Sequence, residues 1–326
     1  MASSVAAMTP PQRLKQLLAG KGCLDVPGVG DPLSARIAHK ELGFEVLFVS
    51  GFFVSAQMLG LPDADMLGYA DMASQTARIR CAVPDAILIV DGDTGYGGPA
   101  QVRRTIRGFG QAGAACVMIE DQEAPKQCGH TEGKKVVPFA EACARVKAAC
   151  DERDEMGAAG PLIMARTDGR ILGNEEARRR AIAFKEIGAD VVFLEAPPDE
   201  ATMREDCATL KGAATMANLV EFSKTPLLGK TRIEELGYKI AIHPVTMLNA
   251  SIGAMFRWAK ELRDGDGRHD TKTKQTPPED GGRGLPELMP FGDLQRMVGF
   301  PQYFAQAELY RKAHSEFAAE PAEKRQ

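Results

Sequence analysis

Eight short apolar runs recur along this chain at fairly regular intervals, and they constrain its fold more than any other feature. The runs occupy residues 23–27, 45–51, 86–93, 115–121, 162–168, 190–196, 214–219 and 239–244. Helical patterns follow them at residues 31–42, 68–82, 98–113, 139–154, 174–188, 199–211, 230–237 and 245–263. Apolar strands that alternate with helices are typical of a parallel sheet covered by helices. Eight such units predict an α/β protein with a (β/α)8 TIM barrel.

A doubly wound nucleotide-binding sheet is the main alternative for such an alternation. It would normally have fewer repeats and a G-x-G-x-x-G turn after its first strand. The first run of this chain continues as VPGVGDP, which lacks the third glycine. We therefore do not expect a dinucleotide site.

The composition changes sharply after the last helical pattern. Residues 264–290 are polar and rich in glycine and proline, which is typical of a linker. Amphipathic spacing then returns, with a predicted break at Pro301. We predict a catalytic barrel at 1–263, a flexible linker at 264–290 and a helical arm at 291–326. A closed barrel does not need this arm, so it is expected to pack on the barrel or to be exchanged with another subunit.

Charge and cysteine content exclude several classes of function. The net charge of −4 leaves no basic surface for nucleic acid, and no apolar run approaches the length of a membrane helix. The seven cysteines form no C-x-x-C pair, which favours reduced thiols and a cytoplasmic location. Residues 1–22 contain basic but no acidic residues, so organelle targeting is kept as a weaker alternative.

Polar residues end almost every predicted strand, where a TIM barrel has its active site. They are Ser50 and Gly51, Asp91 and Asp93, Glu120 and Asp121, Arg166 and Asp168, Glu195, Asn218 and His243. A single polar residue at a strand end is usually a cap. Acids from the adjacent third and fourth strands that meet on one rim are harder to explain in this way, so we place the active site there.

Asp91, Asp93 and Glu120 would repel one another without a cation. A hard divalent ion relieves this repulsion, and carboxylates suit Mg²⁺. The sequence DGDTGYGG resembles the start of a calcium loop, but Tyr96 stands where that loop requires glycine. An Asx-capped turn at residues 91–93 is the structural alternative.

The only Cys-Gly-His sequence begins at Cys128, in a loop that contains several lysines. A zinc site would need a second pair of ligands, which is missing nearby. Lys126 and His130 would favour ionisation of the thiol, which suits an acid that donates its proton to a carbanion. A disulfide or an inert surface thiol is the alternative.

Several motifs in order resemble the isocitrate lyase/phosphoenolpyruvate mutase superfamily over residues 11–263. They are DGDTGYGG, IEDQ, PKQCGH followed by GKKVVP, ARTD, LEAPP and ANLVEFSKTP. The resemblance is closest to the methylisocitrate lyase branch and to the petal-death and carboxyvinyl-carboxyphosphonate mutase-like proteins. SGFFVSAQMLGLPD and EFSKTPL favour the latter.

This resemblance implies a Mg²⁺-dependent barrel, with Mn²⁺ as a substitute, that forms a homotetramer with exchanged C-terminal helices. It implies that Asp91 binds the metal and that Asp93, Glu120 and Asp63 complete the shell directly or through water. The implied catalytic residues are Cys128, Arg166 and Glu195. The implied substrate-binding residues are Ser50, Gly51, Phe52, Gly129, His130 and Asn218.

The resemblance further implies a carbon–carbon lyase. Its substrate would be a 2-hydroxy or 2-oxo dicarboxylic or tricarboxylic acid, of the 2-methylisocitrate, 2,3-dimethylmalate or oxaloacetate class. Its products would be a 2-oxo acid or oxalate plus a carboxylate. Glu195 and a water molecule both remain candidates for the base. Phe52 is expected to reduce the size of the pocket, and Thr246 to influence which substituent is accepted.

Two other functions remain open. A phosphonomutase or phosphonopyruvate hydrolase would act on a phosphorus–carbon bond, but phosphoryl migration needs no carbon acid, so Cys128 favours the lyase. A barrel that has become a non-catalytic scaffold would be expected to have lost an acid at Asp91, Asp93 or Glu120, and all three are present.

Overall fold

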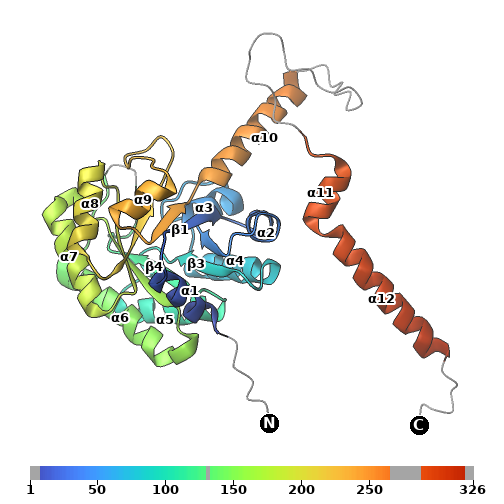
Figure 1. Ribbon diagram of the computed structural model, residues 1–326, viewed down its shortest axis with the longest axis horizontal. Helices are drawn as coiled ribbons and strands as arrows, with labels where there is room; N and C mark the ends of the chain where they lie inside the picture. The colour runs from blue at the N-terminus through green and yellow to red at the C-terminus, as the bar shows by residue number, and fades with distance from the viewer. Residues whose placement is uncertain (1–7, 130–132, 265–287, 320–326) are drawn as a thin grey trace. The chain divides into compact units, whose positions relative to one another are not determined.

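The computed structural model of the chain describes residues 8–129, 133–264 and 288–319. Within these residues, eight parallel strands follow one another around a closed barrel, and β8 pairs with β1 (Figure 1). The strands are β1 (Leu24–Val29), β2 (Val46–Val49), β3 (Ile87–Asp91), β4 (Cys116–Glu120), β5 (Leu162–Thr167), β6 (Val191–Leu194), β7 (Ala214–Asn218) and β8 (Ile240–His243). Each strand overlaps one of the predicted runs, so the TIM-barrel prediction is confirmed.

Alternate residues of each strand point into the barrel, as the two-residue period of a strand requires. The inward side chains form one buried apolar cluster, which includes Phe48, Met118, Phe193, Met216 and Ile242. The intervening residues pack outward beneath the helices. The next inward position on each strand lies at the carboxyl end of the barrel, directly above this apolar layer.

Helix α1 (Pro10–Ala19) covers the amino end of the barrel. Its Leu14 is fully buried and belongs to the same cluster as Val46 and Ile87 inside the barrel. Thr9 caps the helix and forms a capping box with Gln12. This end of the barrel is therefore closed by packing, which leaves the carboxyl end for a site.

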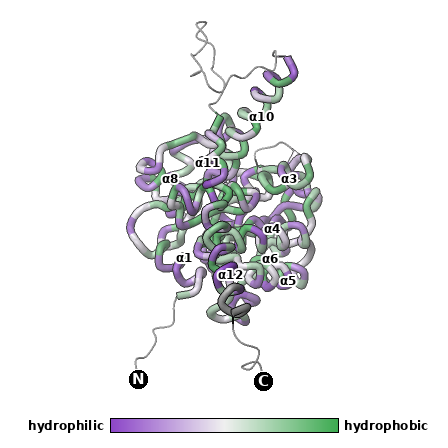
Figure 2. Tube along the Cα trace, turned by 90° about the vertical axis from the view of Figure 1, so that its right-hand side faces the viewer, coloured by the Kyte–Doolittle hydropathy of each residue, from purple (hydrophilic) through white to green (hydrophobic). Residues whose placement is uncertain are grey.

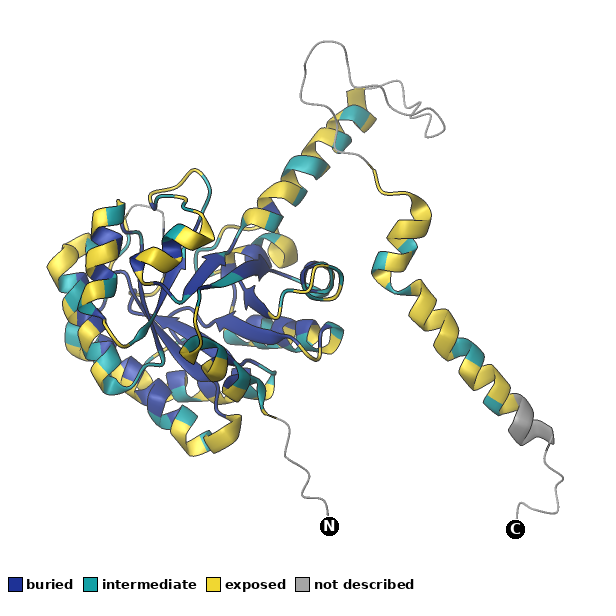
Figure 3. Cartoon of the chain, in the orientation of Figure 1, coloured by how far each residue is buried: buried dark blue, intermediate teal, exposed yellow. Residues whose placement is uncertain are grey.

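The remaining helices of the barrel cover the outside of the sheet and are exposed on their outer faces (Figure 3). They are α2 (Pro32–Arg36), the π-helix η1 (Ile37–Glu41), α4 (Tyr69–Ala82), α5 (Pro99–Gln111), α6 (Phe139–Met156), α7 (Asn174–Ile187), α8 (Glu200–Thr209) and α9 (Lys230–Leu236). Helix α10 (Thr246–Asp264) follows β8, and Leu248 in its first turn is buried. Two 3₁₀ turns are η2 (Gly157–Ala159) and η3 (Gly169–Leu172). The glycines predicted to end helices, Gly43, Gly113, Gly188 and Gly237, all have positive φ angles.

Helix α3 (Gly51–Leu59), which follows β2 directly, was not predicted from the sequence. Its sequence, GFFVSAQML, is almost uniformly apolar and so lacks the one-sided spacing by which helices are recognised. Ser50 is its N-cap, and the hydroxyl of Ser50 accepts a hydrogen bond from the Phe53 amide at 3.4 Å. This unpredicted helix begins at the site described below.

The chain divides into two compact units, Met1–Ile252 and Gly253–Gln326. The second unit contains α11 (Phe291–Val298) and α12 (Phe300–Ala319), which separate at Gly299 with a φ of 96°, close to the predicted break at Pro301. Most of the predicted linker lies outside the described residues. Both hydrophobic and hydrophilic residues occur along α12 (Figure 2), and Tyr303 and Leu309 are exposed. No described helix is both long and apolar enough to cross a membrane.

Candidate active site

The alternation of the strands places the predicted polar residues in one layer at the carboxyl end of the barrel. Two positions beyond inward apolar residues stand Ser50, Asp91, Glu120, Arg166, Glu195 and Asn218. All of them are buried except Asn218, which is partly buried. The side chains therefore face one another across the barrel instead of pointing outward toward the helices.

All of these residues except Glu120 line a cavity of about 120 Å³. Its polar lining consists of Ser50, Asp63, Asp91, Cys128, Arg166, Glu195 and Asn218, together with the backbone of Gly129. Its apolar lining consists of Phe48, Phe52, Met118, Phe193, Met216, Val220, Ile242, Pro244 and Val245. The structure thus gathers nine of the predicted site residues around one cavity. Gly51, Asp93 and Glu120 contact members of this lining, and His130 lies outside the described residues.

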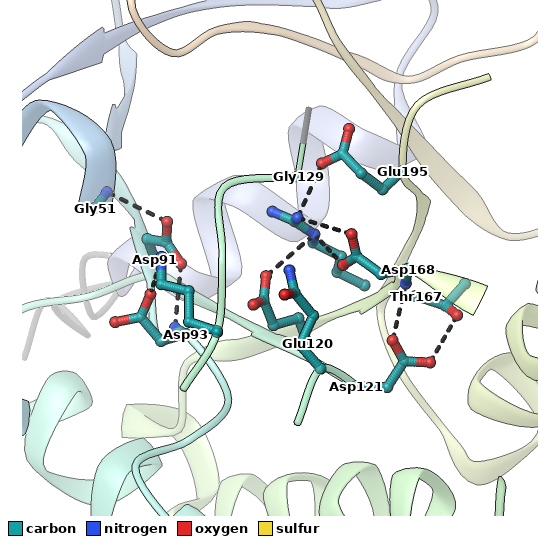
Figure 4. Close-up of polar contacts among 12 residues, drawn as sticks. Gly51, Asp91, Asp93, Glu120, Asp121, Gly129, Thr167, Asp168 and Glu195 are labelled. Atoms are coloured by element: carbon teal, nitrogen blue, oxygen red, sulfur yellow. Dashed lines mark hydrogen bonds and ion pairs between the residues drawn. The ribbon is translucent and has the colours of Figure 1, made fainter. Parts of the chain in front are cut away.

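The acids of β3 are held by backbone amides and by a tyrosine. Asp91 accepts hydrogen bonds from the amides of Gly51 at 3.2 Å and Asp93 at 3.1 Å (Figure 4). Asp93 accepts another from the Tyr96 hydroxyl at 2.8 Å. Asp93 and Tyr96 have φ angles of 50° and 58°, which are unusual for residues with side chains. The loop therefore holds an unfavourable conformation that directs Asp93 toward the site.

Burial and mutual repulsion disfavour the charged form of these acids. Burial and the neighbouring Asp93 raise the pKa of Asp91 to about 6. Burial likewise raises the pKa of Glu120 well above its usual value. One oxygen of Glu120, Oε1, is buried and makes no hydrogen bond within the described residues. A site of this kind would gain stability from a cation.

The donor set fits Mg²⁺. All of the candidate ligands, Asp63, Asp91, Asp93 and Glu120, offer oxygen atoms, which Mg²⁺ prefers. Within the described residues, no three acid, histidine or cysteine side chains converge closely enough to form a ready-made metal shell. Mg²⁺ usually keeps several waters and takes only one or two carboxylates directly, so such a shell is not required.

Lys126, which the sequence analysis considered only as a neighbour of Cys128, lies among these acids. Its ammonium group is 2.7 Å from Asp93 Oδ1 and also contacts Asp63 Oδ1. Its amide donates to Asp65 at 3.1 Å. Burial lowers the pKa of Lys126, but Asp93 and Asp63 oppose burial and hold that pKa well above its usual value. The loop that carries Cys128 is thereby attached to the predicted metal ligands.

Arg166 is the cation at the centre of the layer. Its Nε lies 2.9 Å from Asp168 and 3.2 Å from Glu120, and its Nη2 lies 3.2 Å from Glu195 (Figure 4). Burial lowers the pKa of Arg166, but these carboxylates reverse the effect and raise it well above its usual value. The guanidinium group therefore stays charged and is held in one orientation.

The Cys128–Gly129 segment lies directly against this arginine. A Cβ atom on Gly129 would lie 2.4 Å from Arg166 Nη2 and 2.5 Å from Glu195 Oε2, so no larger residue fits. Cys128 is partly buried and lines the cavity. The seven cysteines are all among the described residues, and none is bonded to another.

Two residues do not face the cavity as the sequence analysis suggested. His243 follows the inward residue Ile242, so it points outward, where its ring lies 2.8 Å from Asp25. Thr246 donates to Glu221 and does not line the cavity, whereas Pro244 and Val245 do. Counting in steps of two from the apolar residues of β8 would have excluded His243.

A second layer of hydrogen bonds, not predicted from the sequence, supports Arg166. Asp121 accepts hydrogen bonds from the Thr167 hydroxyl at 2.7 Å and the Asp168 amide at 2.8 Å (Figure 4). Arg180 donates to the same carboxylate at 2.9 Å. Asp121 points away from the barrel interior and fixes Asp168, which in turn holds Arg166. No local motif marks this arrangement, because its members come from β4, β5 and α7.

Comparison with known proteins agrees with the fold and the motifs. Residues 14–263 match the family described as phosphoenolpyruvate phosphomutase. The chain is 42% identical to the petal death protein of Dianthus caryophyllus over 252 residues, which cover 77% of this chain and 78% of that protein. It is 37% identical to 2,3-dimethylmalate lyase of Eubacterium barkeri over 262 residues, which cover 79% and 88%.

Solved structures show the same architecture. Oxaloacetate acetylhydrolase in complex with 3,3-difluorooxalacetate aligns with a TM-score of 0.81 and 32% identity, over 94% of this chain and 97% of that one. Phosphonopyruvate hydrolase in complex with oxalate and Mg²⁺ aligns with a TM-score of 0.76 and 25% identity, over 91% and 98%. The chain belongs to the phosphoenolpyruvate mutase/isocitrate lyase superfamily, with relatives among its lyases.

Proposed function

We propose that this enzyme is a Mg²⁺-dependent carbon–carbon lyase that cleaves a 2-hydroxy or 2-oxo carboxylic acid. The products would be a 2-oxo acid, or oxalate, and a second carboxylate. The observation that carries this proposal is that the Cys128 thiol and the Asp91 carboxylate line the same cavity. A thiol that could protonate a substrate carbon and a carboxylate that could bind a metal ion would thus contact the same substrate.

The cation would be held by Asp91, with Asp93, Glu120 and Asp63 binding it directly or through water. When bound there, Mg²⁺ would supply a Lewis acid that draws electron density from the substrate oxygens. Glu120 Oε1 makes no hydrogen bond within the described residues, and burial and then Asp93 raise the pKa of Asp91. Both observations support this assignment, because a cation would stabilise the charged form of these acids. Mn²⁺ would suit the same oxygen ligands.

The start of α3 would bind a carboxylate of the substrate. Ser50 offers a hydroxyl group at the N-terminus of a helix, and this end of a helix favours an anion; the Gly51 and Phe53 amides already donate to Asp91 and Ser50. A Cβ on Gly51 would lie 2.9 Å from Asp91 Oδ2, so glycine is needed for this turn to pass so close to the metal ligand. The substrate carboxylate would thereby be placed beside the cation.

Arg166 would stabilise the negative charge that develops when the carbon–carbon bond breaks. Its orientation is already fixed by Asp168, Glu120 and Glu195, so little rearrangement would be needed during the reaction. Cys128 would then donate the proton of its thiol to the carbanion carbon, which forms a C–H bond and leaves a thiolate. Glu195 lines the cavity and remains a candidate base for the hydroxyl proton.

The cavity supports the smaller acids among the candidate substrates. Arg166 is the only cationic side chain among its described lining residues, and half of the wall is apolar. Phe52 lines the cavity together with Ser50, which is proposed to bind the substrate carboxylate. A dicarboxylic acid with a small alkyl group, of the 2,3-dimethylmalate class, would match this lining better than a tricarboxylic acid such as 2-methylisocitrate. Oxaloacetate would also fit, and its hydrolysis is the variant reaction.

Replacement of Cys128 by serine tests the proposal. We expect lyase turnover to fall by about two to four powers of ten, the usual contribution of a general acid, with Mg²⁺ binding by calorimetry unchanged. Cys81→Ser, which alters an exposed thiol on α4, should have no effect. Activity would be measured on a panel of 2-hydroxy and 2-oxo acids, with and without EDTA.

Full activity of Cys128→Ser on these acids would overturn the assignment. Turnover of phosphonopyruvate, with Cys128 dispensable, would establish the phosphorus–carbon alternative. Absence of activity on both sets of substrates would favour the scaffold.

We also propose a homotetramer in which the helical arm is exchanged between subunits. The exposed apolar side chains of α12, such as Tyr303 and Leu309, support this assembly because they would otherwise face water. Light scattering of the full chain and of a chain ending at residue 287 would test it. An unchanged tetramer after this truncation would contradict the exchange. A cytoplasmic location likewise stays a prediction.

A further inference from the structure

Lys134 is a buried lysine at the far end of the loop that carries Cys128. Only 5% of its side chain is exposed, whereas its neighbour Lys135 is exposed. Burying an ammonium group is unfavourable unless it is well partnered. The contacts of Lys134 should therefore be structurally important.

The ammonium group of Lys134 joins two parts of the site. It donates a hydrogen bond to the carbonyl oxygen of Gly129, the residue that follows Cys128. It also lies 2.5 Å from Asp168 Oδ1. Lys134 thus connects the backbone beside the thiol to a carboxylate of the barrel.

Asp168 is a rigid anchor for this connection. Its carboxylate holds Arg166 through two contacts, at 2.9 and 3.2 Å, and its amide donates to Asp121 at 2.8 Å. Because Lys134 and Arg166 bind the same carboxylate, that of Asp168, the loop is held at a fixed position relative to the arginine. Gly129 approaches Arg166 and Glu195 closely, so the loop must be held in a fixed position at this point.

Lys126 attaches the other end of the loop, but it contacts the predicted metal ligands Asp63 and Asp93. A change at Lys126 would therefore alter metal binding as well. Within the described residues, Lys134 contacts the Gly129 carbonyl and Asp168 and none of these ligands, so its effect on the thiol can be measured separately.

We propose that Lys134 is the positioning residue of the Cys128 thiol. By linking the Gly129 carbonyl to Asp168, it places Cys128 in the cavity beside Arg166. The catalytic consequence rests on the proposed function, in which Cys128 protonates carbon. The placement of the thiol does not, because it follows from contacts that exist without turnover.

The test compares Lys134→Gln with Lys135→Gln, which removes the same charge from an exposed position. The rate of Cys128 alkylation by iodoacetamide is followed by mass spectrometry of its peptide, in each folded protein. We expect Lys134→Gln to raise this rate about tenfold, because a lost charged hydrogen bond loosens the segment. We expect kcat to fall up to about a hundredfold, with KM changed much less, because the acid is misplaced. Lys135→Gln should match the wild type.

Lys134→Arg provides a second folded variant that keeps a buried cation able to donate to both oxygens. It should restore a slow alkylation rate and part of kcat. An alkylation rate in Lys134→Gln equal to or below that of the wild type would overturn the proposal. An equal rise in Lys135→Gln would also overturn it, since only charge would then matter.

The outcome is separable from the proposed function. Faster alkylation of Lys134→Gln in a protein without lyase activity would support the positioning of the thiol while refuting the lyase. Unchanged alkylation in an active lyase would refute the positioning alone.

Discussion

The two ends of the barrel differ in whether their charged side chains have enough hydrogen-bond and ion-pair partners. At the amino end, the Arg80 guanidinium donates to four backbone carbonyls, at distances of 2.6–3.3 Å. Arg153 likewise pairs with Asp190 at 2.6 Å and with the Gly188 carbonyl at 2.8 Å. At the carboxyl end, acids crowd together, and Glu120 Oε1 makes no hydrogen bond within the described residues.

This difference separates charges that stabilise the fold from charges that serve the site. A partly buried arginine with several partners keeps these contacts only in the folded state, so its removal should destabilise the protein. A buried acid crowded by other acids costs stability, and the pKa of Asp91, which burial and then Asp93 raise, reflects this cost. Variants at the two ends should therefore affect different measurements.

The largest effect is expected at Asp91. Asp91→Asn should lower Mg²⁺-dependent turnover by about a thousandfold, because a Lewis-acid metal contributes several kcal/mol and each 1.36 kcal/mol is a factor of ten. The thermal midpoint of the metal-free protein should change little, since repulsion is relieved. Asp85→Asn, at an exposed position of the amino end, is the matched control. A large drop in the thermal midpoint of Asp91→Asn would show that this acid also stabilises the fold, which contradicts the difference between the two ends.

The opposite behaviour is expected at Arg80. Arg80→Met should lower the free energy of unfolding by about 1–3 kcal/mol, because four backbone carbonyls, most of them partly buried, lose a charged donor. Its kcat should equal that of the wild type. Denaturant unfolding measures the first quantity and steady-state kinetics the second. Arg78→Met, on the exposed face of the same helix, should be nearly neutral. Reduced kcat with normal stability would show that the amino end also serves catalysis.

Tyr96 sharpens the comparison within the carboxyl end. Tyr96→Phe removes the hydroxyl that orients Asp93, so the Kd for Mg²⁺ should rise about 10–100-fold, as for other residues that orient metal ligands. Titration calorimetry of the metal alone provides the measurement. Tyr69→Phe removes a hydroxyl from the neighbouring ring, whose centroid lies 6.2 Å from that of Tyr96, and should leave the Kd for Mg²⁺ unchanged. Equal Kd values for the two variants would show that Asp93 does not depend on Tyr96.

The smallest effect is expected at Phe52, on the wall of the cavity. Phe52→Ala should shift the ratio of kcat/KM values toward acids with larger alkyl groups by about tenfold, the scale of hydrophobic-pocket discrimination. A series of 2-alkyl-substituted acids measures this ratio. Leu59→Ala, on an exposed position of the same helix, should not change it. An unaltered ratio in Phe52→Ala would remove Phe52 from the determinants of specificity.

Much of the site could be predicted because parallel strands obey a simple geometry. Asp91, Glu120 and Arg166 end apolar runs, and the carboxyl ends of all eight strands must meet at one rim. The same reasoning failed for His243, because the presence of a polar residue at a strand end does not say which way it points. The two-residue alternation decides this, and Ile242 takes the inward position.

Other contacts could not be predicted, because they join residues that are far apart in the chain. Lys126 and Lys134 appeared as loop lysines, yet both are buried against acids contributed by other elements. Helix α3 was missed because a uniformly apolar segment has no periodic signal. Asp168 appeared as a strand-end acid, and its function as a shared anchor depends on three partners.

The amino-acid sequence by itself determined the barrel and the chemistry of its rim, because apolar periodicity and strand ends are local properties. Only the tertiary structure decided which charged side chains share a partner and which have too few partners. That distinction depends on distances between side chains from different strands and loops. It separates the arginines of the amino end, which hold the fold together, from the acids and lysines that surround Cys128.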